Sequence, residues 1–322
     1  MISTYLTRTW GLEIPLIGAP MSPMADGRLA AAISTCGGLG MIGVSSMQPV
    51  EQLERDVAIY RSLARDRPFG IGLMAWAVER RPELLDAALA ARPFAVAMSF
   101  GDPGKYVQRI RDAGARVVSQ VQDRQRAIVA EAAGVDVVDA QGTEAGGHTG
   151  GVGTLPLLQI VLDAVRLPVV AAGGIGSGRG LAAVLAAGAQ GAWIGTPFLA
   201  SEEARNSPAA RTKVVEARET DTVHTRVFDV AQGIPWPPAF PGRALANAFT
   251  ARWHGHESEL ARDEDAKRKL QEARQSEDYS SAFLYAGQSV GLIERVEPAS
   301  TIVRRIVNDA EAHLRGASTL VH

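Results

Sequence analysis

A single histidine stands in a very glycine-rich stretch of the chain. His148 lies in AQGTEAGGHTGGVG, residues 140–153, which holds six glycines. This density predicts a loop whose backbone takes unusual angles or passes close to a ligand. An imidazole titrates near neutral pH and commonly takes protons in catalysis. We therefore interpret His148 as a candidate general base; the alternative is a histidine that only holds the loop. Glu144 either orients this imidazole or caps the loop.

Two later loops have the composition of a phosphate-binding site. GGIGSG, residues 173–178, precedes the helical pattern GRGLAAVLAAG, and Gly195-Thr196 follows the next apolar run. Backbone N–H groups and a helix N-terminus attract an anion, whereas a lone glycine string is also typical of a tight turn. Two such loops at consecutive strand ends favour a bound phosphate. No Walker lysine follows, so a phosphorylated cofactor is favoured over a nucleoside triphosphate.

A third candidate contact surface follows the first apolar run. Residues 18–24, GAPMSPM, combine small side chains, prolines and two methionines. Small residues let backbone amides reach the edge of a flat heterocycle, and methionine packs adaptably on its face. A proline-rich turn with core methionines is the alternative interpretation of this segment.

The elements that must position these loops are strands of a parallel sheet. Eight apolar runs recur with helical segments between them, at residues 14–21, 39–45, 69–74, 94–100, 116–121, 135–142, 168–175 and 191–198. Continuous rather than alternating apolarity is typical of strands covered on both faces. This order predicts a (β/α)₈ TIM barrel of class α/β, with an open Rossmann-type sheet as the second choice. In such a barrel the quoted loops share the carboxyl-terminal face.

The repeat ends near residue 201, and an added segment follows it. A proline cluster and the strongly charged stretch 250–280 predict a small, mainly helical lid at 205–278. We expect residues 1–204 and 279–322 to form the barrel. Trp236, Phe240 and Trp253 are expected to pack the lid rather than bind substrate; the alternative is that one of them lines its entrance.

Composition favours small-molecule chemistry. The formal charge is −2, so no basic field for nucleic acid is expected, and no apolar run is long enough to span a membrane. The N-terminus lacks a signal-peptide pattern, which predicts a cytoplasmic protein. We expect no metal site: Cys36 is the one cysteine, and His254 and His256 lie in a charged, surface-like segment. His224, His313 and His322 have no chemical context. A homodimer is compatible with the sequence, which does not determine the oligomeric state.

Four segments, APMSPMADG, AQGTEAGGHTG, VVAAGGIGSGRG and WIGTPFLAS, occur in an order and spacing that resembles the nitronate monooxygenases, formerly called 2-nitropropane dioxygenases. The resemblance covers about residues 12–202. It implies an FMN-containing barrel with His148 as the base. It also implies a flavin ring near Ala19, Pro20 and Met21, and a phosphate at Gly174, Gly195 and Thr196. We further expect Gly72, Gln120, Gly147 and Gly173 at the cofactor.

Two positions depart from the family pattern. Bacterial members have asparagine where this chain has Gly72, and lysine where we align Gln120. Both changes would alter hydrogen bonding near flavin N1 and O2. Ser22, Ser99 and Gln120 are candidate donors to nitro oxygens.

The resemblance implies an enzyme that oxidises alkyl nitronates, or their parent nitroalkanes, with O₂ to carbonyl compounds and nitrite. An FMN-dependent enoyl-thioester or ene reductase using NAD(P)H is the closest alternative, because such reductases share the GGH loop. A phosphate-ligand binding module without turnover is the third hypothesis.

Overall fold

Eight parallel strands form a closed barrel in the computed structural model, which describes residues 2–320. Their order is β1-β9-β8-β6-β5-β4-β3-β2, and a parallel bridge between Ile17 and Leu39 joins the two ends. The strands are β1 (Leu16–Gly18), β2 (Gly40–Gly43), β3 (Phe69–Met74), β4 (Ala95–Ser99), β5 (Arg116–Val121), β6 (Val137–Gln141), β8 (Val169–Ala172) and β9 (Ala192–Ile194). Each predicted apolar run contains one of them. The TIM barrel is confirmed over the open sheet.

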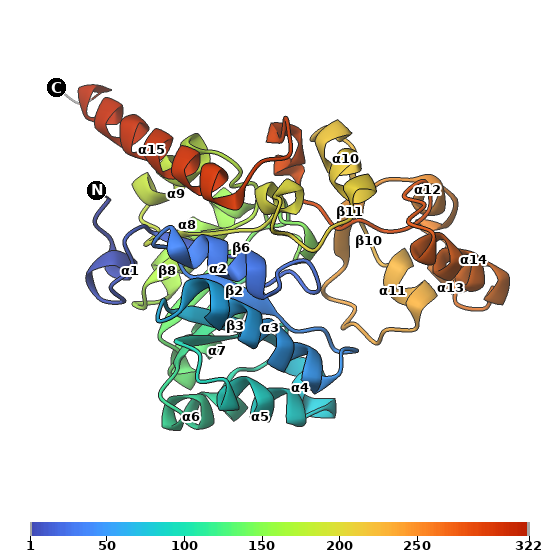
Figure 1. The fold of residues 1–322 in the computed structure, drawn as a ribbon, viewed down its shortest axis with the longest axis horizontal. Coiled ribbons are helices and arrows are strands. Elements are labelled where there is room, and N and C mark those ends of the chain that lie inside the picture. Colours follow the sequence, from blue (N-terminus) through green and yellow to red (C-terminus); the bar gives the residue numbers. More distant parts are fainter. Residues whose placement is uncertain (1, 321–322) are drawn as a thin grey trace.

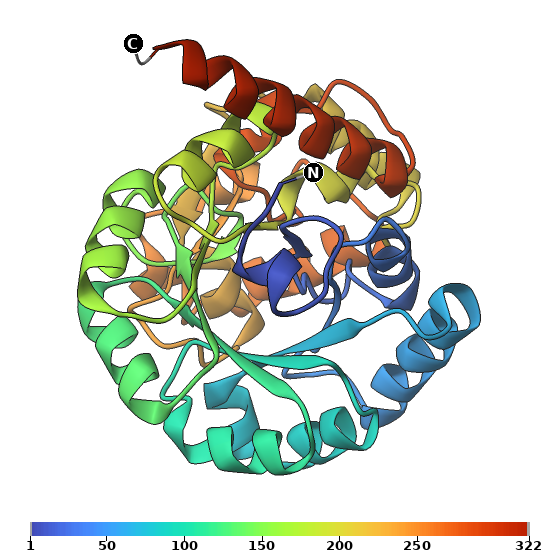
Figure 2. The same ribbon diagram turned by 90° about the vertical axis from the view of Figure 1, so that its left-hand side faces the viewer.

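Helices follow the strands and form the outer ring seen in Figure 2. They are α2 (Gly27–Thr35), α3 (Val50–Ala64), α4 (Ala75–Arg80), α5 (Glu83–Ala90), α6 (Gly104–Asp112), α7 (Arg124–Ala133), α8 (Thr154–Ala164) and α9 (Gly178–Ala186). The last strand leads into a short 3₁₀ helix, η1 (Thr196–Ala200). The long C-terminal α15 (Ala299–Ala317), followed by η3 (Ser318–Leu320), packs on α9 and α2. Ile302, Val303 and Ile306 supply its buried stripe at helical spacing.

The amino end of the barrel is closed by the first residues of the chain. Leu6, on α1 (Tyr5–Arg8), and Trp10 belong to the same buried cluster as the inward-facing Met41, Val118 and Trp193. The α1 segment lies in the middle of the ring in Figure 2. Apolar side chains fill that end of the barrel. Within the described residues, a functional site is therefore expected at the carboxyl-terminal face.

The segment predicted as the lid, residues 205–278 and called the lid below, lies beside the barrel mouth (Figure 1). It contains α10 (Pro208–Glu216), α11 (Val227–Gln232), α12 (Ala248–Trp253), α13 (Glu257–Leu260) and α14 (Glu264–Gln275). It also contains two strands, β10 (Thr222–Thr225) and β11 (Gly242–Leu245). We had predicted a mainly helical lid and did not expect these strands. These strands form a three-stranded antiparallel sheet with β7 (Gly147–His148), so the lid is hydrogen-bonded to the histidine loop.

The predicted domain boundaries at 204 and 279 stay a prediction, and residues 321–322 lie outside the described part. Trp253 packs in the lid's own apolar cluster with Phe228, Phe249 and Leu270, as expected. No helix in residues 2–320 combines the length and apolarity that a membrane span requires.

Candidate active site

His148 is fixed by the lid and the barrel together. It lies on β7, pairs with Gly242 of β11, and is only 9% exposed. Its Nε2 is 2.9 Å from Oδ1 of Asp229, a lid residue that is 3% exposed. On the barrel side, Nε2 of Gln141 donates to the His148 carbonyl at 3.0 Å. The imidazole therefore has a defined place and one nitrogen engaged by a carboxyl group.

The glycines around His148 allow close backbone contacts. Gly147 has φ +73°, which side chains rarely adopt. A Cβ at Gly146 would lie 2.6 Å from the backbone nitrogen of Gly287, far inside contact distance. The loop thus needs glycine because another chain segment, near residue 287, passes directly against it.

An aromatic cluster covers the imidazole. The ring of Trp236 stacks on His148 with centroids 3.4 Å apart and planes 8° from parallel. Trp236 also meets Phe100 and Trp76 edge to face, at 5.0 and 5.1 Å. Phe240 lies 5.2 Å from Phe100. The expectation that Trp236 and Phe240 pack within the lid was wrong: they pack against segments that follow barrel strands β3 and β4.

The backbone of Phe100 is strained. Its φ is +61°, in the left-handed region that non-glycine residues adopt rarely. The residue directly follows β4, and its ring lies 6.4 Å from His148. Strain of this kind persists only where the surroundings impose it, and here the aromatic cluster supplies those contacts.

Glu144 caps a helix rather than orienting the imidazole. Its Oε2 accepts from the backbone nitrogen and the hydroxyl of Thr154, both at 2.8 Å, at the start of α8. A carboxylate at a helix N-terminus satisfies free N–H groups and complements the helix dipole. Of the two interpretations of Glu144 the structure shows the cap. The carboxyl partner of His148 is instead Asp229, which no motif in VFDVAQG indicated.

The first of the two predicted phosphate loops, residues 173–178, has a backbone that depends on glycine. Gly173 and Gly174 have φ of +104° and +69°, and Ser177 caps α9 through a hydrogen bond from Gly180 N at 3.4 Å. A Cβ at Gly173 would lie 2.6 Å from the Thr154 hydroxyl. A cavity of about 370 Å³ reaches Gly174 and is lined by Glu144, Gly174, Glu219, Gln288, Ser289, Gly291 and Leu292.

Sequence reasoning missed the contribution of the C-terminal segment to this region. Gly287, next to η2 (Gln288–Leu292), donates its backbone N–H to the Thr196 hydroxyl at 3.0 Å. The Gln288 backbone N–H donates to the Glu144 carbonyl at 2.9 Å. The only sequence signal was a pair of glycines, Gly287 and Gly291, in a segment that we expected to belong to the barrel.

The loop after β1 packs tightly on its neighbours. A Cβ at Gly72 would lie 2.3 Å from Cγ of Pro20, so glycine is required there by the proline ring. A Cβ at Gly195 would lie 3.0 Å from Sδ of Met21 and 3.1 Å from Cβ of Ala19. The structure therefore brings five of the predicted cofactor residues into contact around the first strand end.

Gln120 does not stand alone. It points into the barrel, and its Nε2 donates to Oδ2 of Asp139 on the neighbouring strand at 2.9 Å. Of the other predicted donors, Ser99 is buried and the Ser22 hydroxyl lies 3.4 Å from Oε1 of Gln48. The structure does not bring these three side chains into mutual hydrogen bonds.

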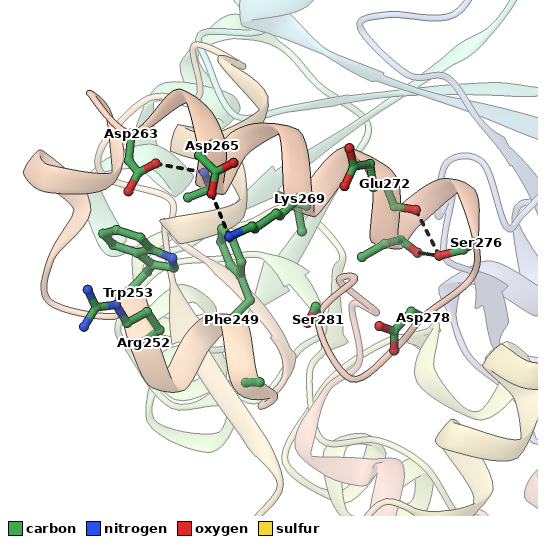
Figure 3. A pocket seen from close by; sticks show the side chains of 14 residues that line it. Phe249, Arg252, Trp253, Asp263, Asp265, Lys269, Glu272, Ser276, Asp278 and Ser281 are labelled. Atoms are coloured by element: carbon green, nitrogen blue, oxygen red, sulfur yellow. Dashed lines mark hydrogen bonds and ion pairs between the residues drawn. The ribbon is translucent and has the colours of Figure 1, made fainter.

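A larger cavity, of about 650 Å³, lies within the lid between α12 and α14 (Figure 3). Phe249, Trp253 and Leu270 contribute apolar side chains to it. Several of its charged groups have partners of their own; Lys269, for example, pairs with Asp265 at 2.7 Å. None of the predicted site residues lines this cavity, so we assign the chemistry to the barrel mouth.

The other histidines have ordinary contacts where they are described. His254 Nδ1 lies 3.0 Å from the Thr225 hydroxyl, and His256 Nδ1 lies 3.2 Å from Oε1 of Glu259. Burial lowers the pKa of His224, which contacts the Pro241 carbonyl. Within residues 2–320 no three His, Cys, Asp or Glu side chains gather as a metal site would require. His322 lies outside the described residues.

Comparison with known families identifies the family of this chain. The sequence profile described as nitronate monooxygenase matches residues 82–309, more than half of the chain. The chain belongs to the nitronate monooxygenase family. A second profile, IMP dehydrogenase / GMP reductase domain, matches residues 1–152. Family membership makes the chain an enzyme, a flavoprotein oxidoreductase, as the sequence predicted.

Individual relatives agree with this membership. A probable nitronate monooxygenase from Staphylococcus aureus (strain MSSA476) is 29% identical over 94% of this chain and 96% of its own length. Among solved structures, FabK from Thermotoga maritima is 31% identical with a TM-score of 0.87, over 100% of both chains. A nitroalkane oxidase from Streptomyces ansochromogenes is 29% identical with a TM-score of 0.80, over 95% of this chain and 98% of that one. The two solved structures share the whole fold of this chain.

Proposed function

We propose that this protein uses FMN and O₂ to oxidise alkyl nitronates, and nitroalkanes, to carbonyl compounds and nitrite. The observation that carries the proposal is the buried His148–Asp229 pair at the mouth of a barrel of the nitronate monooxygenase family. A histidine held by a carboxyl group is suited to take a proton from carbon. A small-molecule substrate and O₂ are the partners that this reaction requires.

The residues present fit a phosphorylated flavin. Gly173 and Gly174 have positive φ values that favour glycine, and a capped helix, α9, begins shortly after them at Gly178. Gly195 and Thr196 lie at the adjacent strand end. Ala19, Pro20 and Met21 are only partly buried on the same face. We propose that the two glycine loops hold the phosphate and that residues 19–21 hold the ring. When bound, FMN would supply the electron acceptor.

We propose a separate role for each nitrogen of His148. With Asp229 as a carboxylate, Nε2 carries the hydrogen of the 2.9 Å contact, and Nδ1 keeps the lone pair that accepts the substrate proton. Asp229 then faces the imidazolium that forms and stabilises its charge. Burial and Asp229 raise the pKa of Tyr285 well above its ordinary value, so this phenol stays neutral beside the pair.

The aromatic cluster has two functions in this proposal. Trp236, stacked at 3.4 Å, holds the plane of the imidazole, so the lone pair of Nδ1 keeps one direction. Together with Phe100 and Phe240, it covers the ring with apolar surface and excludes water, which strengthens the electrostatic interaction with Asp229.

The cofactor itself can be tested directly. We expect the purified protein to show flavin absorbance and to release FMN, not FAD, on heat denaturation. The reason is a barrel phosphate site with no dinucleotide-binding fold beside it. Chromatography of the released cofactor against both standards is the measurement. FAD, or no flavin, would contradict the assignment.

The reaction can be tested by anaerobic mixing. Purified protein is mixed with ethyl nitronate, propionate 3-nitronate, NADH or NADPH, and flavin bleaching is recorded. The proposal expects rapid bleaching by a nitronate and slow bleaching by the nicotinamides. The reverse order would favour the ene reductase. A colourless protein that binds phosphate would favour the binding module.

A further inference from the structure

Two rungs of polar side chains occupy the inside of the barrel between β5 and β6. Gln120 and Asp139 form the lower rung, and Gln122 and Gln141 form the upper one, with Nε2 of Gln122 donating to Oε1 of Gln141 at 3.0 Å. Side chains two residues apart on a strand share a face, and Val118 and Val137 below them belong to the interior apolar cluster. The upper rung continues to the backbone of His148 through Gln141.

Asp139 is an unusual member of this column. Its side chain is 0% exposed, and its one hydrogen bond within the described residues comes from the neutral amide of Gln120. Oδ1 of Asp139 has no partner there, and neither has Oε1 of Gln122. A buried carboxylate without a nearby cation is very unfavourable. A neutral carboxylic acid avoids this cost and adds an O–H donor to a column whose other donors are amide N–H groups.

Among the described residues, the strands that flank Asp139 place no compensating charge beside it. β6 holds no other titratable residue, β8 holds none, and the single one on β5 is Arg116, at the opposite end of that strand over Trp10 and Phe94. The hydrogen bond that links this column to His148 comes from Gln141 of the upper rung and ends at the His148 carbonyl. Burial accordingly raises the pKa of Asp139 to about 8, with the Gln120 amide acting in the opposite direction.

We propose that Asp139 is a positioning residue for the flavin site: as a neutral carboxylic acid it anchors Gln120 and couples its proton to the charge on the flavin. The inference rests on the flavin binding proposed above. Gln120 is only partly buried whereas Asp139, its register partner on β6, is fully buried, so the amide is the exposed member of this rung. Negative charge gained at the mouth favours the protonated acid, and by reciprocity the neutral acid favours flavin reduction.

The protonation state can be measured by infrared spectroscopy on the full-length protein. At about pH 6, ordinary carboxyl groups are ionised, so a protonated-carboxyl band reports raised pKa values. We expect this band to lose intensity in Asp139→Asn and to be unchanged in Asp163→Asn, an exposed aspartate on α8. In the unmodified protein the Asp139 component should disappear as the pH rises through about 8 or above. Identical bands in the unmodified protein and Asp139→Asn would overturn the proposal.

The coupling is tested by the flavin midpoint potential measured from about pH 6 to about pH 9.5. In the unmodified protein we expect the potential to fall more steeply once Asp139 ionises, because reduction then also takes up a proton at Asp139. Asp139→Asn should show no such break. Asp139→Leu, whose apolar side chain suits the barrel interior, is the second variant and should also lack it. A purely structural role would not change the slope.

The outcomes separate this inference from the function on which it rests. Parallel slopes in flavin-loaded unmodified protein and both variants would overturn the role of Asp139 alone. A protein that binds no flavin would overturn the proposed function and the positioning role with it, while the infrared result still reports the protonation state of Asp139.

Discussion

Replacing His148 with alanine is expected to reduce turnover of neutral nitroalkanes by about 10²-fold or more, the lower range for loss of a general base. Nitronates have already lost the proton, so their oxidation should fall much less. If His148 only tethers its loop, both substrates should suffer together, because the glycine loop would lose its side-chain contact with Asp229 of the lid. The measurement is the ratio of kcat/KM for a nitroalkane and its nitronate, with flavin content determined first. Equal losses would refute the assignment.

Two companion variants make this test sharper. His148→Ala leaves the buried Asp229 carboxylate with the Tyr285 hydroxyl, 3.5 Å away, as its remaining side-chain donor, and a lost hydrogen bond to a charged group costs about 1.5–3 kcal/mol. The double variant H148A/D229N removes that charge and should recover thermal stability while staying inactive on nitroalkanes. Asp229→Asn alone keeps a hydrogen-bond acceptor but not the charge that stabilises imidazolium. Its nitroalkane activity should lie between those of the unmodified protein and His148→Ala.

Changing Gly174 to glutamate is expected to abolish flavin retention while the barrel stays folded. A Cβ added at Gly174 would lie 3.4 Å from Cβ of Glu144, an ordinary contact, so the new carboxylate can extend beside the cavity that Glu144 and Glu219 already line. A further negative charge at that place repels a phosphate. Flavin per protein is read from the absorbance spectrum, and folding from circular dichroism.

The matched control for this prediction is Gly174→Gln. Both variants put a side chain on a backbone with φ +69°, a strain of order 1–3 kcal/mol, and the two side chains have nearly the same size. We expect the glutamine variant to retain more flavin than the glutamate variant. Stoichiometric flavin in Gly174→Glu would show that the phosphate does not lie at this loop.

The barrel could be predicted because its strands are local patterns. Each is a short continuous apolar run bounded by turn residues, and the glycines of the functional loops stand directly at the run ends. The same logic placed His148 on the correct face. The assignments of the cofactor residues to a flavin stay predictions.

What escaped prediction depends on contacts between distant segments. Asp229 lies 81 residues beyond His148, and two-residue β7 is too short to leave a pattern. Gly72 looked like a departure from a family asparagine, but the reason for glycine is the ring of Pro20, which follows a different strand. Asp139 stood inside an apolar run that was interpreted as strand, and only the closed barrel shows that this acid points inward.

The sheet shared between lid and barrel limits how the protein can be re-engineered. Strand β11 is contributed by the lid, and its partner β7 is contributed by the chain between β6 and α8. A chimaera that grafts the lid of a relative onto this barrel would therefore also exchange the partner of residues 147–148 and the acid that contacts His148. Lid and histidine loop are best transplanted as one unit, although α8, β8, α9 and β9 of the barrel separate them along the chain.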